Sequence, residues 1–208
     1  MSWTAGWLAG MAAAALVAVL ELDVVQFGQF MISRPLVLGP LLGLLFGLPQ
    51  TGLALGACCE LFSLDDLPVG GSLPLNATVA VSAALLLNCG PRAVPPEVAL
   101  PAGLTAGWLH QKIETALRYR RRALCGCAEE SLLRGCEPRL GRLVGQAICE
   151  QAAMTFTVLL ACVLVVGPAL HWLWPHAPHS AVEALRFAWA LAPWLGLGVL
   201  LHALKVTP

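Results

Sequence analysis

Long apolar runs separated by short polar breaks dominate the sequence. The first run covers residues 3–22. A second tract covers residues 35–64 and is interrupted by Gly-Leu-Pro-Gln-Thr-Gly at residues 47–52. A straight helix needs about 20 apolar residues to cross a bilayer, and each flank of the interruption offers only about a dozen. The tract therefore predicts either one bent pass with a partial one, or two half-helices that form a re-entrant hairpin. Such breaks are tolerated at membrane depth only where protein or a water-filled cavity covers the backbone.

The remaining apolar segments are of two kinds. Short segments cover residues 76–87 and about 98–109, with several prolines between them. Longer segments cover about residues 147–174 and 184–204. Together with the first two tracts, they predict an all-α integral membrane protein with about five to six membrane segments, including short broken or re-entrant helices.

The composition supports this class. Of the 208 residues, 58% are hydrophobic and 12% are charged, whereas a soluble domain carries about 25% charged residues. The 12 basic residues balance the 12 acidic ones, which argues against a nucleic-acid binder that relies on bulk positive charge. The eight cysteines do not predict a disulfide scaffold, because such proteins are short and rich in polar loops.

Residues 111–145 differ from the rest of the chain because they are polar and basic. This stretch holds eight of the 12 basic residues and four glutamates, so its net charge is +4. The positive-inside rule places it on the cytoplasmic side of the membrane. A docking surface for an acidic partner or for anionic lipid is the alternative explanation. The chain is thus expected to divide into an N-terminal membrane region (1–110), a basic cytoplasmic amphipathic segment (111–145) and C-terminal membrane helices (146–208).

Acidic side chains within apolar surroundings are the first candidates for function. A charge at the centre of a spanning helix costs about 2.5–3.5 kcal/mol on insertion scales, so it normally faces a cavity or a partner. Glu60 lies directly after the broken centre of the second tract and is the strongest candidate. Glu21 and Asp23 close the first run, and Asp65 and Asp66 follow Glu60. These four acids are either part of the same site or interfacial groups at helix ends.

Two further stretches add polar groups near the broken helices. One contains Gln29 and Arg34, and Arg34 is the only basic residue among the first 91. Its guanidinium is expected to pair with one of the nearby acids, which offsets the burial of both charges. The other stretch runs from Pro74 through Asn76 to Thr78 and leads into a short apolar segment. Amide, hydroxyl, carboxylate and guanidinium groups near broken helices suit a neutral polyhydroxy ligand and indicate a transporter.

The histidines do not suggest a metal site. His171, His176 and His179 cluster around two prolines near two tryptophans, which is typical of the membrane–water interface. His110 and His202 lie near the ends of apolar runs and are also interpreted as interfacial. Motifs for phosphate-loop, zinc-protease or serine-hydrolase chemistry are absent from the sequence, and no cofactor is expected.

The polar positions and the glycine-rich motifs occur in a characteristic order within residues 20–85. In order, they are Asp23, Gln29, Ser-Arg-Pro-Leu at 33–36, Gly-Leu-Leu-Phe-Gly-Leu-Pro-Gln-Thr-Gly-Leu at 43–53, Gly-Ala-x-x-Glu-Leu at 56–61 and Leu-Pro-Val-Gly-Gly at 67–71. This order resembles the IIC membrane component of the mannose/fructose/sorbose phosphotransferase family. Behind residue 85 the resemblance is one of layout.

The resemblance implies a sugar permease subunit in the bacterial cytoplasmic (inner) membrane. It implies a IID membrane subunit as partner, IIA and IIB phosphocarrier proteins, a hexose-type sugar, and assembly into hetero- and homo-oligomers surrounded by lipid. Phosphate would pass to the sugar from a histidine of IIB, so the IIC chain would not itself be the enzyme. The substrate-binding residues that it implies are Glu60, Gln29, Arg34, Asn76, Asp23 and Thr78.

Two departures from the family pattern support an alternative. Relatives commonly have an aspartate where this chain has Asn76, and longer relatives continue with further apolar segments. Loss of a carboxylate removes a strong acceptor for sugar hydroxyls. The alternative is therefore a membrane-bound regulatory or degenerate phosphotransferase component, a short form that no longer transports sugar.

Overall fold

The described part of the chain is helical. The computed structural model describes residues 3–24, 28, 30–64 and 73–204, and no strand occurs among them. Three helical stretches are long and apolar enough to cross a membrane: Gly6–Asp23, Leu140–His176 and His179–His202. Two shorter apolar helices, Pro35–Leu45 and Ala77–Cys89, accompany them. The prediction of an all-α membrane protein that combines long and short helices is confirmed.

The interrupted tract folds as a hairpin of two short helices. Helix α1 (Trp3–Leu20) ends in the 3-10 turn η1 (Glu21–Val24), and the hairpin follows as α2 (Pro35–Leu45) and α3 (Pro49–Phe62). With 11 and 14 residues, the two helices are about 16 and 21 Å long, so neither crosses a bilayer alone. The two-half-helix alternative describes the structure, and the single bent pass does not.

Glycines allow α2 and α3 to pack with their backbones in contact. A Cβ on Gly52 would meet the carbonyl oxygen of Gly39 and lie 3.1 Å from the Cα of Gly43. A Cβ on Gly56 would meet the carbonyl oxygen of Pro35 at the other end of the pair. This order of contacts shows that the two helices are antiparallel. Gly47 has a φ of +74° at the turn between them, a conformation that favours glycine.

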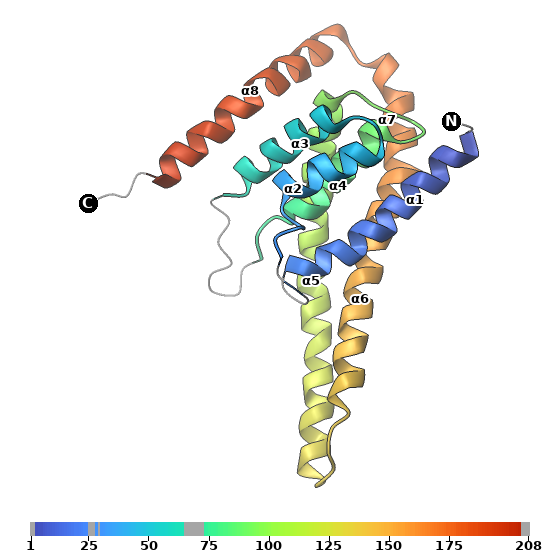
Figure 1. Cartoon of the computed structure of the whole chain (residues 1–208), viewed down its shortest axis with the longest axis vertical. Coiled ribbons are helices and arrows are strands. Elements are labelled where there is room, and N and C mark those ends of the chain that lie inside the picture. The colour runs from blue at the N-terminus through green and yellow to red at the C-terminus, as the bar shows by residue number, and fades with distance from the viewer. Residues whose placement is uncertain (1–2, 25–27, 29, 65–72, 205–208) are drawn as a thin grey trace.

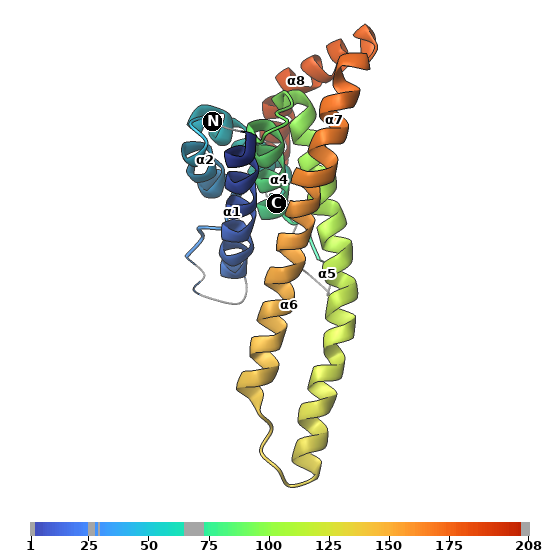
Figure 2. The same ribbon diagram turned by 90° about the vertical axis from the view of Figure 1, so that its right-hand side faces the viewer.

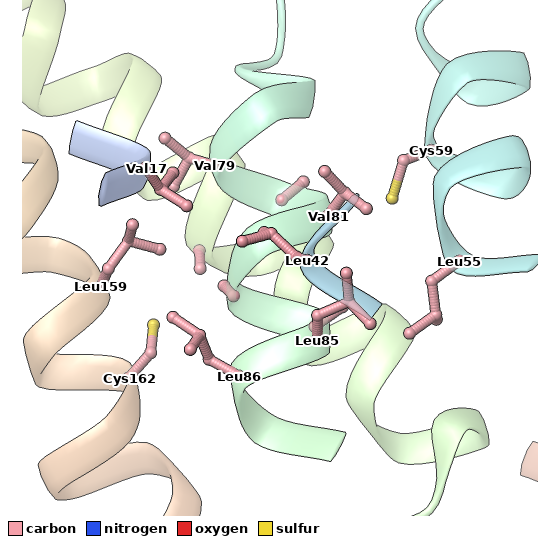
Figure 3. Close-up of a cluster of buried hydrophobic side chains, with 14 of the residues drawn as sticks. Val17, Leu42, Leu55, Cys59, Val79, Val81, Leu85, Leu86, Leu159 and Cys162 are labelled. Carbon is pink, nitrogen blue, oxygen red and sulfur yellow. The ribbon is translucent and has the colours of Figure 1, made fainter. Parts of the chain in front are cut away.

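Helix α4 (Ala77–Cys89) forms the centre of the bundle. Its residues from Thr78 to Leu87 are all buried, so this 13-residue helix has no face toward lipid or water. Figure 3 shows Val79 and Leu86 near Val17 of α1 and Leu159 of α6. Other α4 side chains lie toward the α2–α3 hairpin, where the contacting residues are Leu42, Leu55 and Cys59. A core built around a short helix explains why apolar residues occur on every side of α4 instead of on one face.

Two long helices extend beyond the bundle. Helix α5 (Pro96–Leu133) has 38 residues and is followed by α6 (Leu140–Ala161). Their far ends form an antiparallel pair that projects past the other helices, and we call residues 111–150 the arm (Figures 1 and 2). The expected boundary between residues 110 and 111 lies inside α5, because the apolar segment and the basic stretch share one continuous helix.

The C-terminal part continues from α6 without a sharp break. A π-helical turn (Cys162–Val166) leads into α7 (Gly167–Leu173) and a 3-10 turn (Trp174–His176). Helix α8 (His179–Leu204) then crosses the end of the bundle opposite the arm (Figure 1). Large apolar side chains such as Phe187 and Trp194 are exposed on α8, as expected for a helix that faces lipid.

The close contact between α2 and α3 predicts sensitivity to a single methyl group. Gly52→Ala forces the hairpin apart and should lower the free energy of unfolding by about 1–3 kcal/mol, the usual cost of overpacking. Gly145→Ala on α6 is the matched control, since no atom lies within 4 Å of an added Cβ there. Thermal unfolding of both variants in detergent measures the difference. An equal midpoint for the two variants would contradict the packing argument.

Candidate functional site

Asp23 organises the loop that precedes α2. Its Oδ1 accepts a hydrogen bond from the backbone N–H of Phe30 at 2.7 Å, and its Oδ2 accepts one from Ile32 at 3.0 Å. The Ser33 hydroxyl donates to the same Oδ2 at 3.5 Å. Met31 has a φ of +63° within this loop, and such a conformation is strained in a non-glycine residue. The buried Asp23 carboxylate therefore holds the loop in shape.

Arg34 and Glu60 form an ion pair where this loop meets the end of α3. Arg34 Nη1 lies 2.9 Å from Glu60 Oε1, and the backbone N–H of Leu36 donates to Glu60 Oε2 at 3.4 Å. The second contact places the carboxylate at the N-terminus of α2, where the helix dipole favours a negative charge. The Arg34 side chain is 56% exposed and that of Glu60 is 17% exposed. Of the acids to which Arg34 was expected to pair, the structure selects Glu60.

Thr78 connects the central helix to the same loop. Its hydroxyl donates to the carbonyl oxygen of Ser33 at 2.9 Å, and the Ser82 hydroxyl donates to the carbonyl oxygen of Thr78 at 2.7 Å. Both hydroxyls are buried, so these bonds satisfy groups that would otherwise be costly inside the bundle. Ser33, the residue directly before Arg34, is thus held by Asp23 of η1 and by Thr78 of α4.

A second cluster of polar side chains is buried beside the first. Glu21 is 6% exposed and accepts three hydrogen bonds from neutral donors. Asn76 Nδ2 and Gln151 Nε2 donate to Oε1 at 3.0 and 3.3 Å, and the Thr155 hydroxyl donates to Oε2 at 3.4 Å. The donors come from the N-terminus of α4 and from α6. A buried carboxylate requires such partners, because its desolvation is otherwise prohibitive.

The remaining bonds determine which atoms donate in this cluster. Asn76 Oδ1 accepts from the backbone N–H of Val79 at 3.0 Å and so caps α4, which orients the amide with Nδ2 toward Glu21. Asn76 Nδ2 also lies 3.2 Å from His110 Nδ1, which must then accept. His110 Nε2 therefore carries the proton and donates to Thr155 Oγ1 at 3.0 Å. Every polar group of the cluster is satisfied by one directional set of bonds.

The cluster extends into the arm through charged groups. Gln151 Oε1 accepts from Arg121 Nη2 at 3.1 Å, and Arg121 Nε lies 3.6 Å from Glu150 Oε2. On α5, Glu114 Oε2 lies 3.9 Å from His110 Nδ1, but that nitrogen carries no proton in this arrangement and forms no ion pair with the carboxylate. The polar contacts therefore run without interruption from the loop before α4 to the root of the arm.

The structure brings five of the six predicted site residues to one region. Asp23, Arg34, Glu60, Asn76 and Thr78 lie where η1, the loop before α2, the end of α3 and the start of α4 meet. The sixth, Gln29, lies outside the described residues, and so do the acids at 65 and 66.

One other sequence interpretation changes. His110 was interpreted as interfacial, but it is fully buried, because α5 continues past it instead of ending there. Glu21 is buried as well, although its position at a helix end also fitted an interfacial acid. Gln151 and Thr155 were not singled out. Their spacing of four residues within an apolar run, which places them on one helix face, was the available signal.

The described residues contain no group of three His, Cys, Asp or Glu side chains that is suited to a metal ion. Cys58, Cys59 and Cys162 are buried free thiols that pack in the core. The polar side chains that the structure describes in this region carry carboxylate, guanidinium, amide and hydroxyl groups.

Comparison with known proteins identifies the family. Residues 8–207 match the family described as "PTS system sorbose-specific IIC component". Because this match covers nearly the whole sequence, the chain belongs to the sorbose-type IIC family of phosphotransferase-system membrane components. No curated protein sequence matches the chain.

Two solved structures share the fold. One is described as "Structure of membrane protein", with a TM-score of 0.76 and 16% sequence identity. The other is the cryo-EM structure of the mannose transporter ManYZ in complex with microcin E492, with a TM-score of 0.65 and 17% identity. Each comparison covers 98% of this chain and 81% of the other.

The Thr155 hydroxyl links His110 to Glu21, and its contribution to the free energy of unfolding can be measured. Thr155→Val keeps the shape but leaves the His110 donor and one Glu21 oxygen without a partner. We expect a loss of about 1–3 kcal/mol in the free energy of unfolding. Thr157→Val is the control on the same helix, because that exposed hydroxyl bonds only to the carbonyl oxygen of Ala153. Thermal unfolding in detergent compares the two, and equal losses would contradict the assigned network.

The neutral amide of Asn76 donates to the charged carboxylate of Glu21 without repulsion. In Asn76→Asp, a second carboxylate replaces the amide whose nitrogen lies 3.0 Å from Glu21 Oε1. The two carboxylates repel each other and Glu21 loses this donor, so the variant should lose about 1–3 kcal/mol in the free energy of unfolding. Adding Glu21→Gln restores one carboxylate and one amide and should recover much of that loss. Thermal unfolding of the single and double variants in detergent tests both statements, and an unchanged midpoint in the Asn76→Asp single variant would refute the pairing.

Proposed function

We propose that the chain is the sugar-translocating permease subunit of a phosphoenolpyruvate-dependent phosphotransferase system of the mannose/fructose/sorbose class. The observation that carries the proposal is the Arg34–Glu60 pair at the open end of a broken-helix hairpin, in a chain that belongs to the IIC family. Broken helices around a polar site are typical of secondary transporters, because their ends supply polar groups at membrane depth.

Arg34 and Glu60 are the proposed direct sugar ligands. A sugar hydroxyl can accept a hydrogen bond at its oxygen and donate one through its hydrogen. The Arg34 guanidinium can therefore donate to the hydroxyl groups of a hexose, and the Glu60 carboxylate can accept from them. Arg34 is half exposed, which leaves its remaining N–H groups accessible. Gln29 belongs to the same proposed sugar path by its position in the motif order.

Asp23, Thr78 and Asn76 are proposed to line and shape that path. Their polar atoms are engaged by the protein: Asp23 by the loop before α2, Thr78 by Ser33, and Asn76 by Glu21 and His110. A sugar hydroxyl would reach these groups by exchanging one of those bonds. Their effect on affinity would then depend on the loop geometry as well as on direct contact.

The proposed partners follow from the family. A IID membrane subunit would complete the transporter, a hexose-type sugar would be the substrate, and IIA and IIB proteins would deliver the phosphoryl group. The mannose transporter ManYZ, which shares the fold, is consistent with this assignment. The proposed location is the bacterial cytoplasmic membrane, with the basic arm on the cytoplasmic side and with lipid around the exposed apolar faces.

Glu60→Ala tests the proposed role of the ion pair. In cells that express all partners, this variant should lose sugar uptake while it still inserts into the membrane. Glu130→Ala is the matched control, since it breaks an Arg–Glu pair of 2.5 Å with Arg134 at the far end of the arm. Uptake of labelled mannose, fructose and sorbose is measured beside the amount of inserted protein. Normal uptake by Glu60→Ala would remove Glu60 from the sugar path.

A regulatory or degenerate component is the second candidate, and Asn76 is the observation that favours it. Here the position commonly occupied by an aspartate carries an amide that is engaged in a buried network. This candidate predicts that the wild-type chain accumulates no sugar even when all partners are present. Detectable uptake in the same assay would exclude it.

A further inference from the structure

A cleft on the arm lies outside the candidate sugar site. Its volume is about 120 Å³, and four of its lining residues come from α5: Thr115, Arg118, Tyr119 and Arg122. Their spacing places all four on one face of the helix. The opposite wall is Leu73, in the segment that leads into α4. The cleft therefore begins just after the buried His110, at the root of the arm.

The two walls of the cleft are tied together. The side-chain amide of Gln111, one turn before Thr115, donates to the carbonyl oxygen of Leu73. The Thr115 hydroxyl in turn donates to the carbonyl oxygen of Gln111 at 2.8 Å. These bonds fix the segment beside the helix, so the spacing between the walls is part of the fold.

The charge of the cleft is positive. Arg118 uses Nε and Nη2 to contact Glu114 Oε1 at 3.1 and 2.7 Å, so its second amino group stays outside this pair. The Arg122 guanidinium stacks over the Tyr119 ring at 4.5 Å. Stacking occupies the face of the guanidinium and leaves its N–H edges available. Among the described residues, no carboxylate lies within ion-pair distance of Arg122.

Two arginines four residues apart on one helix face repel each other unless an anion lies between them. The guanidinium fork matches the oxygens of a phosphate group in geometry and charge. We propose that this cleft binds a phosphate group, carried either by a soluble phosphomonoester such as a sugar phosphate or by the headgroup of an anionic lipid. The headgroup of a lipid would lie where the apolar half of α5 gives way to its basic half.

The first arm of the test measures soluble phosphate. The full chain is placed in nanodiscs of phosphatidylcholine, and binding of inorganic phosphate and mannose 6-phosphate is measured by calorimetry, with mannose as the uncharged probe. Arg118→Gln with Arg122→Gln should weaken phosphate binding about tenfold or more. Arg134→Gln with Arg139→Gln is the matched control. It removes the same charge and likewise includes one arginine paired with a glutamate four residues away.

The second arm measures lipid phosphate. Nanodiscs that contain phosphatidylglycerol are compared with pure phosphatidylcholine, and retained phosphatidylglycerol is counted by native mass spectrometry. A loss specific to the cleft variant in either arm supports the proposal and identifies the source. Equal retention and equal affinity in the cleft and control variants would overturn it. If the double variant does not fold, Arg122→Gln is compared with Arg139→Gln. Neither measurement requires a partner or transport, so its outcome is independent of the Glu60 uptake test.

Discussion

The rest of the structure depends on the satisfaction of the buried Glu21 carboxylate. No water is available at membrane depth to solvate a carboxylate, so the protein must supply its donors. Asn76 supplies one from the start of α4, and Gln151 and Thr155 supply two more from α6. These bonds join the end of α1, the central helix and the root of the arm. Since Asn76 also caps α4, the same residue sets both the start of the central helix and its position against Glu21.

The short helices follow from the same constraint. Each of α2 and α4 begins near an acidic side chain. Glu60 accepts directly from the backbone N–H of Leu36 in α2, whereas Glu21 accepts from the side chain of Asn76, which itself caps α4. A carboxylate at a helix N-terminus pairs with unsatisfied N–H groups and with the positive end of the dipole. Helices that begin inside the bundle are thereby stabilised without water. The candidate sugar site and the buried cluster therefore share one feature, an acidic side chain beside the start of a short helix. They differ in exposure, because the Arg34 side chain is exposed whereas His110 is buried.

The arm gives the fold a second polar region. Its root is connected to the buried cluster through the hydrogen bond from Arg121 to Gln151 and through His110, which lies on α5 itself. The basic face of α5 that carries the phosphate cleft lies one turn beyond this connection. A group bound in the cleft would therefore contact the same helix that holds Asn76 through His110. This continuity offers a physical route by which events at the arm could influence the loop before α4.

The sequence by itself determined the class of the protein, the break in the second tract and most of the candidate site. These conclusions rest on local signals, which can be recognised without knowledge of the fold. The signals are apolar runs too short to span a membrane, a single early arginine, and acids beside glycine-rich breaks. Tertiary structure alone decided that Arg34 pairs with Glu60 instead of Glu21 or Asp23, and that His110 is buried. Glu21 and Thr155 are 134 positions apart in the chain, and no periodicity reports such a contact. The reason is physical: burial of a polar group depends on which distant helix supplies its partner, and that is a property of packing.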